Sequence, residues 1–427
     1  MTLILIETLF WGAIALVAYT YTGYPLLVWL LSRRRCRNSP EPSFETDGSS
    51  NSKALPAVTI VIAAYREESV ILERLNNLAK LDYPSDKLEI LIGCDGNLDL
   101  TGELVSSYDD DRIRLIQFEH RRGKASVLND CVPQAKGEII VFSDANTQMD
   151  PQCIKQLVKH FQNQNTGCVC GQLILEDRVS GKNEDGLYWK YENFLKHCEN
   201  RLGAVLGVNG ALYALRKNLY TQIPANTIND DFLIGMRIHL AGYQLIYEDS
   251  AFAIEETAST VQDEFQRRTR IGTGAFQSLN LLKGLLNPKY GYLAFAFWSH
   301  KVLRWFCPVL MAVALLANLC LIDNPIYQIT LVAQGLFYLS AFFGTKVVKN
   351  GRCHKFCSVS GMFVQMNLAL AFGLYRWIFT LQNGTWEHVN RNHAATLPVD
   401  DLNEPAPELN PLESETSLEE LSPYSKS

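Results

Sequence analysis

The sequence predicts an α/β fold, in which a mostly parallel sheet has helices on both faces and is flanked by transmembrane helices. Three observations support this prediction. Short apolar runs typical of strands alternate with segments of helical periodicity between residues 55 and 287. Strands that are separated by helices pair in parallel, and such sheets are covered on both faces. Apolar stretches long enough to cross a bilayer lie on either side of this region.

We predict that residues 1–32 form a transmembrane anchor. Residues 3–31 are almost wholly apolar, with Glu7 as the only charged side chain, and four arginines follow at once: Arg33, Arg34, Arg35 and Arg37. Because a basic cluster is retained on the cytoplasmic side of a membrane, we expect the N-terminus outside. A cleaved signal peptide would place its positive charges before a shorter apolar run, and the order here is reversed.

Three further apolar stretches near the C-terminus are each about long enough to cross a bilayer, namely residues 305–322, 326–345 and 359–381. The last stretch contains Gln365, Asn367 and Arg376, so packing in the interface or against neighbouring helices is the alternative for it. Four crossings in the whole chain would put the C-terminal tail outside. Three crossings with an interfacial last helix would leave it inside.

An aromatic-rich segment with basic side chains, LNPKYGYLAFAFWSHK, precedes these stretches and indicates a helix at the headgroup level. We therefore assign residues 288–385 to an interfacial helix and C-terminal transmembrane helices. Residues 33–54 are expected to be a linker, because most of this segment is rich in Ser, Pro and acidic residues. Residues 386–427 are expected to be an acidic, disordered tail with too little apolar content to fold alone. The globular domain is then 55–287.

Within this domain, four short apolar runs are expected to be strands, at residues 58–65, 88–96, 113–118 and 138–145. A helix is expected at 67–81, where apolar residues recur at helical spacing. In parallel sheets, ligands bind beyond the carboxyl ends of the strands. Polar side chains end three of these strands: Arg66, Glu67 and Glu68, then Asp95, then Asp144 and Asn146. We expect these strand ends to offer carboxylates to one crevice.

The usual nucleotide-binding loops are absent from the sequence. No G-x-G-x-x-G follows the first strand and no G-x-x-x-x-G-K-[ST] occurs, so phosphates must be held otherwise. A divalent cation at Asp144, with Asn146 as a second ligand, would bridge diphosphate oxygens, helped by Arg122 and Lys124 in RRGKASVLN. We therefore expect Mg²⁺ or Mn²⁺ as cofactor; the alternative is that SDANT is only a turn. The formal net charge of −6 gives no general reason to expect nucleic acid as a partner.

In their order and spacing, these segments resemble the membrane-embedded inverting glycosyltransferases of family 2, which include cellulose, hyaluronan, chitin and poly-N-acetylglucosamine synthases. AAYREE resembles the nucleotide-contacting end of the first strand, and GCDG carries Asp95 at the base- or ribose-binding position. RRGKASVLN resembles the segment with Gly123 and Lys124, and SDANT occupies the position of the metal-binding Asp-x-Asp. The resemblance implies a GT-A-type fold and a nucleotide-sugar donor, with uridine as the default base. Without it, Asp95 before Gly96 is as readily a turn residue.

Two further segments resemble the acceptor side and the catalytic base of this family. GVNGALYALRK resembles the acceptor-side loop, with Gly210 and Ala211, and NDDFLIGMRIHLAGY resembles the segment that bears the base, at Asp231. The resemblance implies that Asp231 deprotonates the acceptor hydroxyl opposite the leaving diphosphate, with inversion of configuration. Asp230 is expected on the acceptor side, pointing elsewhere or capping a helix. A simple helix start is the alternative for both acids.

The chain departs from the family pattern at two places. Asp144-Ala145-Asn146 replaces Asp-x-Asp, and an amide oxygen brings no charge to a metal. The synthases' Gln-x-x-Arg-Trp corresponds to RRTRI, which keeps Arg270 but has Ile271 in place of the stacking Trp. We expect Arg268 and Arg270 to bind the donor diphosphate; anionic lipid headgroups are the alternative ligand. Without the Trp platform, we expect transfer of one or a few sugars rather than processive synthesis.

We therefore expect a multi-pass cell-membrane hexosyltransferase with a cytoplasmic catalytic domain. The expected substrates are a nucleotide-diphospho-sugar, by default a UDP-sugar, and a lipid-linked or polysaccharide acceptor, with other polysaccharide-assembly proteins as further partners. The alternatives are a processive exopolysaccharide synthase and a catalytically silent sugar-nucleotide-binding regulator, for which Asn146 is the hint. A nucleotidyltransferase of similar fold would release pyrophosphate. The large α/β domain speaks against a pure carrier or channel.

Overall fold

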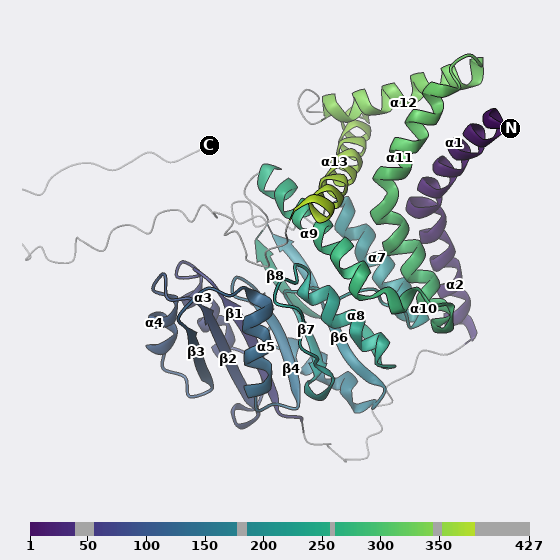
Figure 1. Ribbon diagram of the computed structural model, residues 1–427. Helices are drawn as coiled ribbons and strands as arrows, with labels where there is room; N and C mark the ends of the chain where they lie inside the picture. Colours follow the sequence, from purple (N-terminus) through teal and green to yellow (C-terminus); the bar gives the residue numbers. More distant parts are fainter. Residues whose placement is uncertain (39–54, 177–185, 257–260, 345–351, 381–427) are drawn as a thin grey trace, which may run out of the picture. The chain divides into compact units, whose positions relative to one another are not determined.

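The computed structural model describes residues 1–38, 55–176, 186–256, 261–344 and 352–380. Its centre is an eight-stranded sheet with the strand order β3-β2-β1-β4-β7-β6-β8-β5 (Figure 1). The strands are β1 (Val58–Ala64), β2 (Leu88–Asp95), β3 (Ile113–Phe118), β4 (Ile139–Asp144), β5 (Gln148–Met149), β6 (Thr166–Glu176), β7 (Tyr213–Arg216) and β8 (Gln244–Glu256). β1 to β4 are mutually parallel, whereas β7 runs antiparallel between β4 and β6. The predicted mostly parallel sheet is confirmed, and each of its four predicted strands agrees to within one residue at either end.

Helices cover both faces of this sheet, because its central strands alternate apolar side chains between two cores. On β1, Ile60 and Ile62 belong to the core shared with α3, α4 and α6, whereas Val61 and Ala63 belong to the core shared with α5, α7, α8 and α9. The helices are α3 (Ile71–Ala79), α4 (Thr101–Ser106), α5 (Lys124–Gln134), α6 (Cys153–Val158), α7 (Leu187–Leu202), α8 (Asp230–Leu240) and α9 (Val261–Leu281).

The first helix after β1 starts later than the sequence predicts. Arg66 has a φ of +57°, in the left-handed region, so the chain turns sharply where β1 ends. The backbone N–H of Glu67 then donates to the Oγ1 atom of Thr101, the first residue of α4, at 2.9 Å. Helix α3 therefore begins at Ile71 and ends at Ala79, inside the expected range 67–81.

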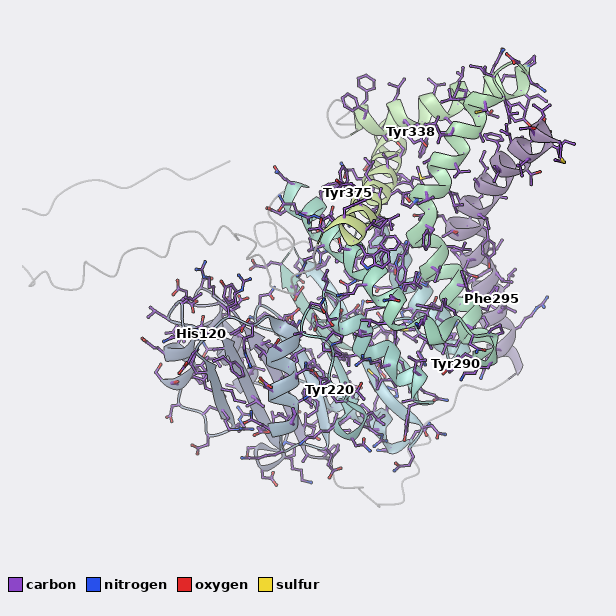
Figure 2. All side chains as sticks on the ribbon, in the orientation of Figure 1. His120, Tyr220, Tyr290, Phe295, Tyr338 and Tyr375 are labelled. Atoms are coloured by element: carbon purple, nitrogen blue, oxygen red, sulfur yellow. The ribbon has the colours of Figure 1, made fainter. Side chains whose placement is uncertain are left out.

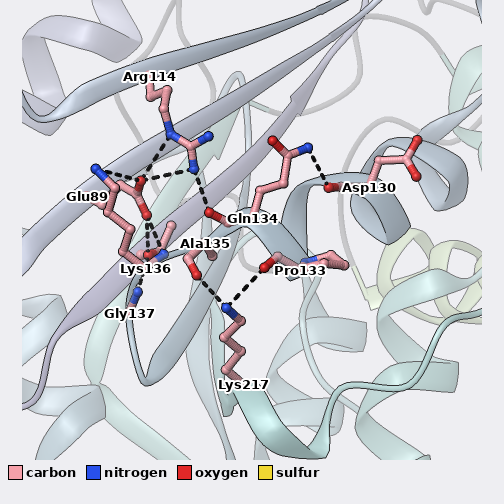
Figure 3. Close-up of polar contacts among 10 residues, drawn as sticks. Glu89, Arg114, Asp130, Pro133, Gln134, Ala135, Lys136, Gly137 and Lys217 are labelled. Carbon is pink, nitrogen blue, oxygen red and sulfur yellow. Dashed lines mark hydrogen bonds and ion pairs between the residues drawn. The ribbon is translucent and has the colours of Figure 1, made fainter.

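A polar network fixes the far end of α5 at the amino-terminal edge of the sheet (Figure 3). Glu89 on β2 accepts hydrogen bonds from Arg114 Nε at 3.2 Å and from the backbone N–H of Lys136 at 2.8 Å. Lys217, just after β7, donates through Nζ to the carbonyl oxygens of Pro133 at 3.2 Å and Ala135 at 2.5 Å. Because these bonds hold the C-terminal end of α5, its first residue is held at the opposite edge of the sheet.

Four helices of the described chain are long and apolar enough to cross a membrane: Thr2–Arg35, Tyr292–Cys320, Pro325–Phe343 and Cys357–Phe379. They consist of α1 (Thr2–Ala18) and α2 (Tyr24–Asn38), α10 (Tyr292–Ala296) and α11 (Leu303–Cys320), α12 (Pro325–Gly344), and α13 (Arg352–Phe379). Figure 2 places Phe295 on α10, Tyr338 on α12 and Tyr375 on α13. π-helical turns, Tyr19–Gly23 and Phe297–Val302, join the first two pairs without a break.

The structure differs here from the expected separate interfacial helix. The aromatic segment forms α10 and continues through the π-helical turn into α11, so it is the start of one long helix. An aromatic, amphipathic sequence has the same helical period in either arrangement, which is why the sequence did not distinguish them. Most of the expected linker, residues 39–54, and the expected tail, 386–427, lie outside the described residues.

A buried polar network joins the candidate membrane-spanning helices to α7 of the sheet domain. Tyr24 OH donates to Glu199 Oε1 at 2.8 Å, and His300 Nδ1 lies 2.6 Å from the same oxygen. Arg304 of α11 forms an ion pair with Glu192. Burial alone would raise the pKa of Glu192, but Arg304 and Lys301 hold it well below its ordinary value. Since removing one partner of a buried pair leaves an uncompensated charge, this network fixes the helices to the domain.

Small residues allow α9 and α13 to cross closely. A Cβ atom added at Gly373 would lie 2.7 Å from the backbone carbon of Gly272, far inside van der Waals contact. Close approach through small residues is a common way for membrane helices to pack. Next to the crossing, the rings of Phe265 and Phe372 meet edge to face at 6.0 Å. Helix α9, which carries the predicted arginine cluster, is therefore packed directly on α13.

Candidate active site

The carboxyl edge of the sheet brings together three predicted site residues from three elements. Asp144 is the last residue of β4, Lys124 is the first of α5, and Asp230 is the first of α8. Lys124 Nζ lies 2.5 Å from Asp144 Oδ1 and 3.7 Å from Asp230 Oδ2. Asn146 follows Asp144 by two residues in the turn before β5, and both side chains are half-buried. The sequence analysis expected Lys124 and Asp144 at one phosphate site and Asp230 pointing elsewhere or capping a helix, and it did not indicate that Lys124 would lie between the two carboxylates.

Burial makes both acids of α8 reluctant to ionise. It raises the pKa of Asp231 to about 6, with the charge of Asp230 adding to the effect and Lys124 opposing it. Burial also raises the pKa of Asp230, against Lys124, and within the described residues Asp230 Oδ2 accepts no hydrogen bond. Burial would lower the pKa of Lys124, but Asp144 and Asp230 together raise it above its ordinary value. A carboxylate with a pKa near 6 is mostly ionised at pH 7 yet basic enough to take a proton.

The predicted acceptor-side loop lies against the predicted base. A Cβ atom added at Gly210 would be 3.2 Å from Asp231 Oδ2, so a side chain there would crowd the carboxylate. Ala211, the next residue, is buried. Asp231 Oδ1 accepts a hydrogen bond from the backbone N–H of Phe232 at 2.7 Å, which leaves Oδ2 as the oxygen nearest the loop. The structure thus brings Asp231, Gly210 and Asp230 to one place.

Sequence reasoning missed the residues that hold this loop. Asn209 donates through Nδ2 to the carbonyl oxygen of Gly171 at 2.7 Å, and its Oδ1 accepts from Lys196 Nζ at 2.5 Å. Lys196 is buried on α7, as are Glu192 and Glu199. These three charged residues recur at i, i+4 and i+7, on one face of a helix otherwise rich in aromatic residues. That spacing was the available signal for a charged face turned inward.

Asp95 is committed to the loop that leads into α5. Its Oδ1 accepts from the backbone N–H of Arg122 and its Oδ2 from that of Gly123, both at 2.7 Å. Gly123 has a φ of +88°, a conformation that favours glycine, and Lys124 follows it. Asp95 therefore positions Lys124. Its predicted contact with a base or ribose stays a prediction.

The predicted arginine cluster divides into paired and exposed members. Arg267 Nε and Arg268 Nε both form ion pairs with Glu264, at 2.9 and 2.7 Å, and Arg268 also lies 5.0 Å from the ring of Tyr188. Arg270 is exposed, and its charge acts on Asp230 to oppose the rise of that pKa. Toward the described residues Arg270 forms no hydrogen bond or ion pair, so of the three it is the most available to a phosphate.

The oxygen-rich edge of the sheet suits a hard divalent cation. The ammonium of Lys124 already acts as a stand-in cation between Asp144 and Asp230. Among the described residues, however, no group of three or more His, Cys, Asp or Glu side chains could hold a metal ion. Mg²⁺ is often bound by one or two carboxylates together with substrate phosphates, and this donor set fits that mode of binding.

The sheet and the helices on its faces have the GT-A-type fold. The fold is similar to that of a mannosyltransferase from Pyrobaculum calidifontis, solved in complex with GDP-Man and Mn²⁺. The TM-score is 0.65 at 21% sequence identity, over 88% of this chain and 99% of that one. At this identity the likeness shows the fold alone.

Residues 59–220 match the family model of glycosyl transferase family 2. The matched segment therefore has the character of a family 2 glycosyltransferase domain, as the resemblance in the sequence predicted. Two poly-β-1,6-N-acetyl-D-glucosamine synthases are similar to it. The Staphylococcus aureus (strain COL) enzyme is 26% identical over 236 residues, or 54% of this chain and 57% of the relative. The Staphylococcus epidermidis enzyme is 24% identical over 237 residues, with the same two shares. The chain thus spans little more than half the length of these relatives.

Proposed function

We propose that this protein moves a single sugar, or a few, from a nucleotide-diphospho-sugar to a lipid-linked or glycan acceptor at a membrane. UDP-sugars are the default donors. The observation that carries the proposal is the cluster of Asp144, Lys124 and Asp230, beside a base-like Asp231 that faces the Gly210 loop. One side of the cluster is suited to a diphosphate, and the other is open to a hydroxyl.

The proposed reaction is one displacement at the anomeric carbon. Asp231 takes the proton of the acceptor hydroxyl, whose oxygen forms a bond to the anomeric carbon while the bond to the diphosphate oxygen breaks. Lys124 and Arg270 neutralise charge on the leaving nucleoside diphosphate. Asp144 and Asn146 would hold Mg²⁺ or Mn²⁺, which when bound neutralises the same charge. Attack opposite the leaving group inverts the configuration.

The proposed orientation places the catalytic domain on the cytoplasmic side. Its support is the run of Arg33, Arg34 and Arg35 at the end of the first candidate span, just before the domain begins. Nucleotide sugars and reduced cysteines are both compatible with that compartment, and the described cysteines form no disulfide. Labelling of cysteines in intact cells with a thiol reagent that cannot cross the membrane tests the orientation. Labelling of the exposed Cys320 from outside is compatible with the proposed orientation. Labelling of a cysteine introduced at Asp86, in the sheet domain, would contradict the proposal.

A processive exopolysaccharide synthase is the second candidate, and two observations favour it. The similar curated proteins are polymer synthases, and the chain has four helices able to cross a membrane. Against it, Ile271 is 42% exposed on α9 and offers a branched aliphatic surface where a flat ring would suit a sugar. The two candidates differ in product length.

Two measurements on the purified full-length chain test the proposal. Incubation with a panel of nucleotide sugars should release a free nucleoside diphosphate from one donor, whereas a nucleotidyltransferase would release pyrophosphate and a silent regulator neither. Sizing of radiolabelled product by gel filtration should then give a short, organic-extractable product. A void-volume polymer made by the chain alone would establish the processive candidate instead.

A further inference from the structure

Helix α3 buries a complete arginine side chain directly behind the Asp144–Asn146 turn. Arg74 has no exposed surface and is the largest fully buried side chain among the described residues. Its Nη2 donates to Ser143 Oγ at 2.8 Å, and its Nη1 donates to the carbonyl oxygen of Thr147 at 2.5 Å. One guanidinium therefore binds the residue before the turn and the residue after it.

Two more residues, Asn77 and Glu255, help to hold the same turn. Arg74 Nη1 also donates to Asn77 Oδ1 at 2.8 Å, and Asn77 exchanges two hydrogen bonds of 2.9 Å with the backbone of Met149 on β5. From the other side, Thr147 Oγ1 donates to Glu255 Oε1 on β8 at 2.9 Å. The turn is thus fixed between α3 and β8.

Burial alternates along the turn in a way that divides its two sides. Ala145 and Thr147 are buried, at 2% and 0% exposure, whereas Asp144 and Asn146 are half-buried. Arg74 holds the buried side, so Asp144 and Asn146 are presented together on the open side. The hydrogen bonds of Arg74 go to Ser143, Thr147 and Asn77.

The hydrogen bonding of the buried guanidinium is incomplete. Arg74 Nε is buried without a hydrogen-bond partner within the described residues, and such a group costs roughly 1–3 kcal/mol. Replacing a buried charged group by a well-packed apolar one is often neutral or stabilising. A role in geometry accounts for an arginine at this place better than a role in stability, because only its planar fork spans Ser143 and Thr147 at once.

We infer that Arg74 is a positioning residue for the cation and diphosphate site: it sets the spacing of the Asp144 and Asn146 oxygens, and thereby the affinity for a divalent cation bound together with a nucleoside diphosphate. The inference rests on the proposed function, in which these two residues hold the cation. Groups that orient metal ligands typically change metal affinity by 10–100-fold when they are mutated.

The test is a titration of Mn²⁺ into the full-length protein with UDP or GDP, whichever the wild type binds, with free Mn²⁺ followed by electron paramagnetic resonance. In Arg74→Lys a single ammonium cannot span both acceptors, so Mn²⁺ should bind about 10–100-fold more weakly. At saturating Mn²⁺, kcat should return to within a few-fold of the wild type. The matched control is Arg216→Lys: Arg216 likewise donates to backbone carbonyls, those of Thr166, Phe161 and Asn163, but at the far edge of the sheet. It should leave Mn²⁺ affinity unchanged.

Wild-type affinity for Mn²⁺ in a folded Arg74→Lys variant would overturn the inference. If that variant does not fold, Ser143→Ala removes one acceptor of Arg74, together with the long 3.5 Å hydrogen bond from Ser143 Oγ to the carbonyl oxygen of Asp144. It should weaken Mn²⁺ binding a few-fold, and unchanged affinity there overturns the inference equally. A wild type that binds no Mn²⁺ with either nucleotide refutes the cation site of the proposed function, and this inference with it. If the wild type binds Mn²⁺ and the variants bind it with the same affinity, only the role of Arg74 is refuted.

Discussion

The pH dependence of sugar transfer should follow the ionisation of Asp231. Burial, with Asp230 adding to it, raises the pKa of Asp231 from 3.8 to about 6. A general base acts only as the carboxylate, so kcat/KM should fall as the pH drops through about 6 and not near 4. About half of the enzyme would be active at pH 6 and about a tenth at pH 5, and further below the midpoint the loss approaches about tenfold per pH unit.

Changing the neighbour should move this acidic limb. Asp230→Asn removes a negative charge that raises the pKa of Asp231, so the limb should shift to lower pH, by on the order of one unit. Asp82→Asn is the control, because Asp82 pairs with Lys155 on the protein surface and should leave the limb in place. Initial rates at low donor concentration, with constant ionic strength and Mn²⁺, measure it. A wild-type limb below pH 5, or identical limbs in the wild type and Asp230→Asn, would refute this account of Asp231.

The raised pKa of Asp231 affects stability in the opposite direction from activity: it favours the folded state at low pH. Because the folded-state pKa of Asp231 lies above its ordinary value, the folded protein binds more protons than the unfolded chain between about pH 4 and 6. The contribution of Asp231 to the free energy of unfolding is therefore most favourable below pH 4 and is lost as the pH rises through 6. Asp231→Asn keeps an oxygen that can accept from the N–H of Phe232. At pH 7 its free energy of unfolding should exceed that of the wild type by on the order of 1–3 kcal/mol, so it should unfold at a higher temperature. Equal melting temperatures would contradict this sign.

Three further outcomes follow from the site and its supports. Asp231→Asn should abolish transfer while nucleoside diphosphate binding, measured by calorimetry, stays within a few-fold; near-normal turnover would remove Asp231 from the mechanism. Chelation of divalent cations should abolish activity, and added Mg²⁺ or Mn²⁺ should restore it. Asp144→Ala should abolish activity irreversibly, whereas Asn146→Asp should be tolerated. Full activity in excess chelator would show that SDANT is only a turn. Glu192→Ala should lower the free energy of unfolding by about 3–5 kcal/mol, because it leaves Arg304 unpaired in the interior. Gly373→Leu should separate α9 from α13. Unchanged thermal unfolding of both variants would show that these contacts are not needed.

Local patterns predicted the parts of the fold that local physics decides. β1, β2 and β4 are short apolar runs buried on both faces, so their composition alone marked them as strands of a parallel sheet. The resemblance of the motifs also led us to expect Asp144 and Lys124 at one phosphate site, and the structure brings Asp230 to the same place. The start of α3 was misplaced because it depends on the left-handed Arg66 and on Thr101, which is distant in sequence.

Long-range pairing accounts for what the sequence could not predict. Glu192 and Arg304 are 112 residues apart, and nothing near either one identifies its partner. Asp95 was expected to face a ligand, yet both of its oxygens hold the backbone of the loop before α5, because the approach of that loop is set by the whole sheet. Arg74 lies at the helical spacing of the apolar face of α3, and only the packed structure shows that its charge is buried there and which groups it binds.

The network around Glu199 constrains the order in which the chain can assemble. Tyr24 lies in the first helix to be synthesised, but its hydroxyl bonds to Glu199, which follows 175 residues later. At about 5–20 residues per second, roughly 10–35 seconds of translation separate the two. His300, the other partner of Glu199, emerges 101 residues later again. The Tyr24 hydroxyl must therefore wait without these partners until first α7 and then the turn Phe297–Val302 have been synthesised. Ribosome-bound chains stopped before Glu199 should accordingly remain protease-sensitive next to that helix.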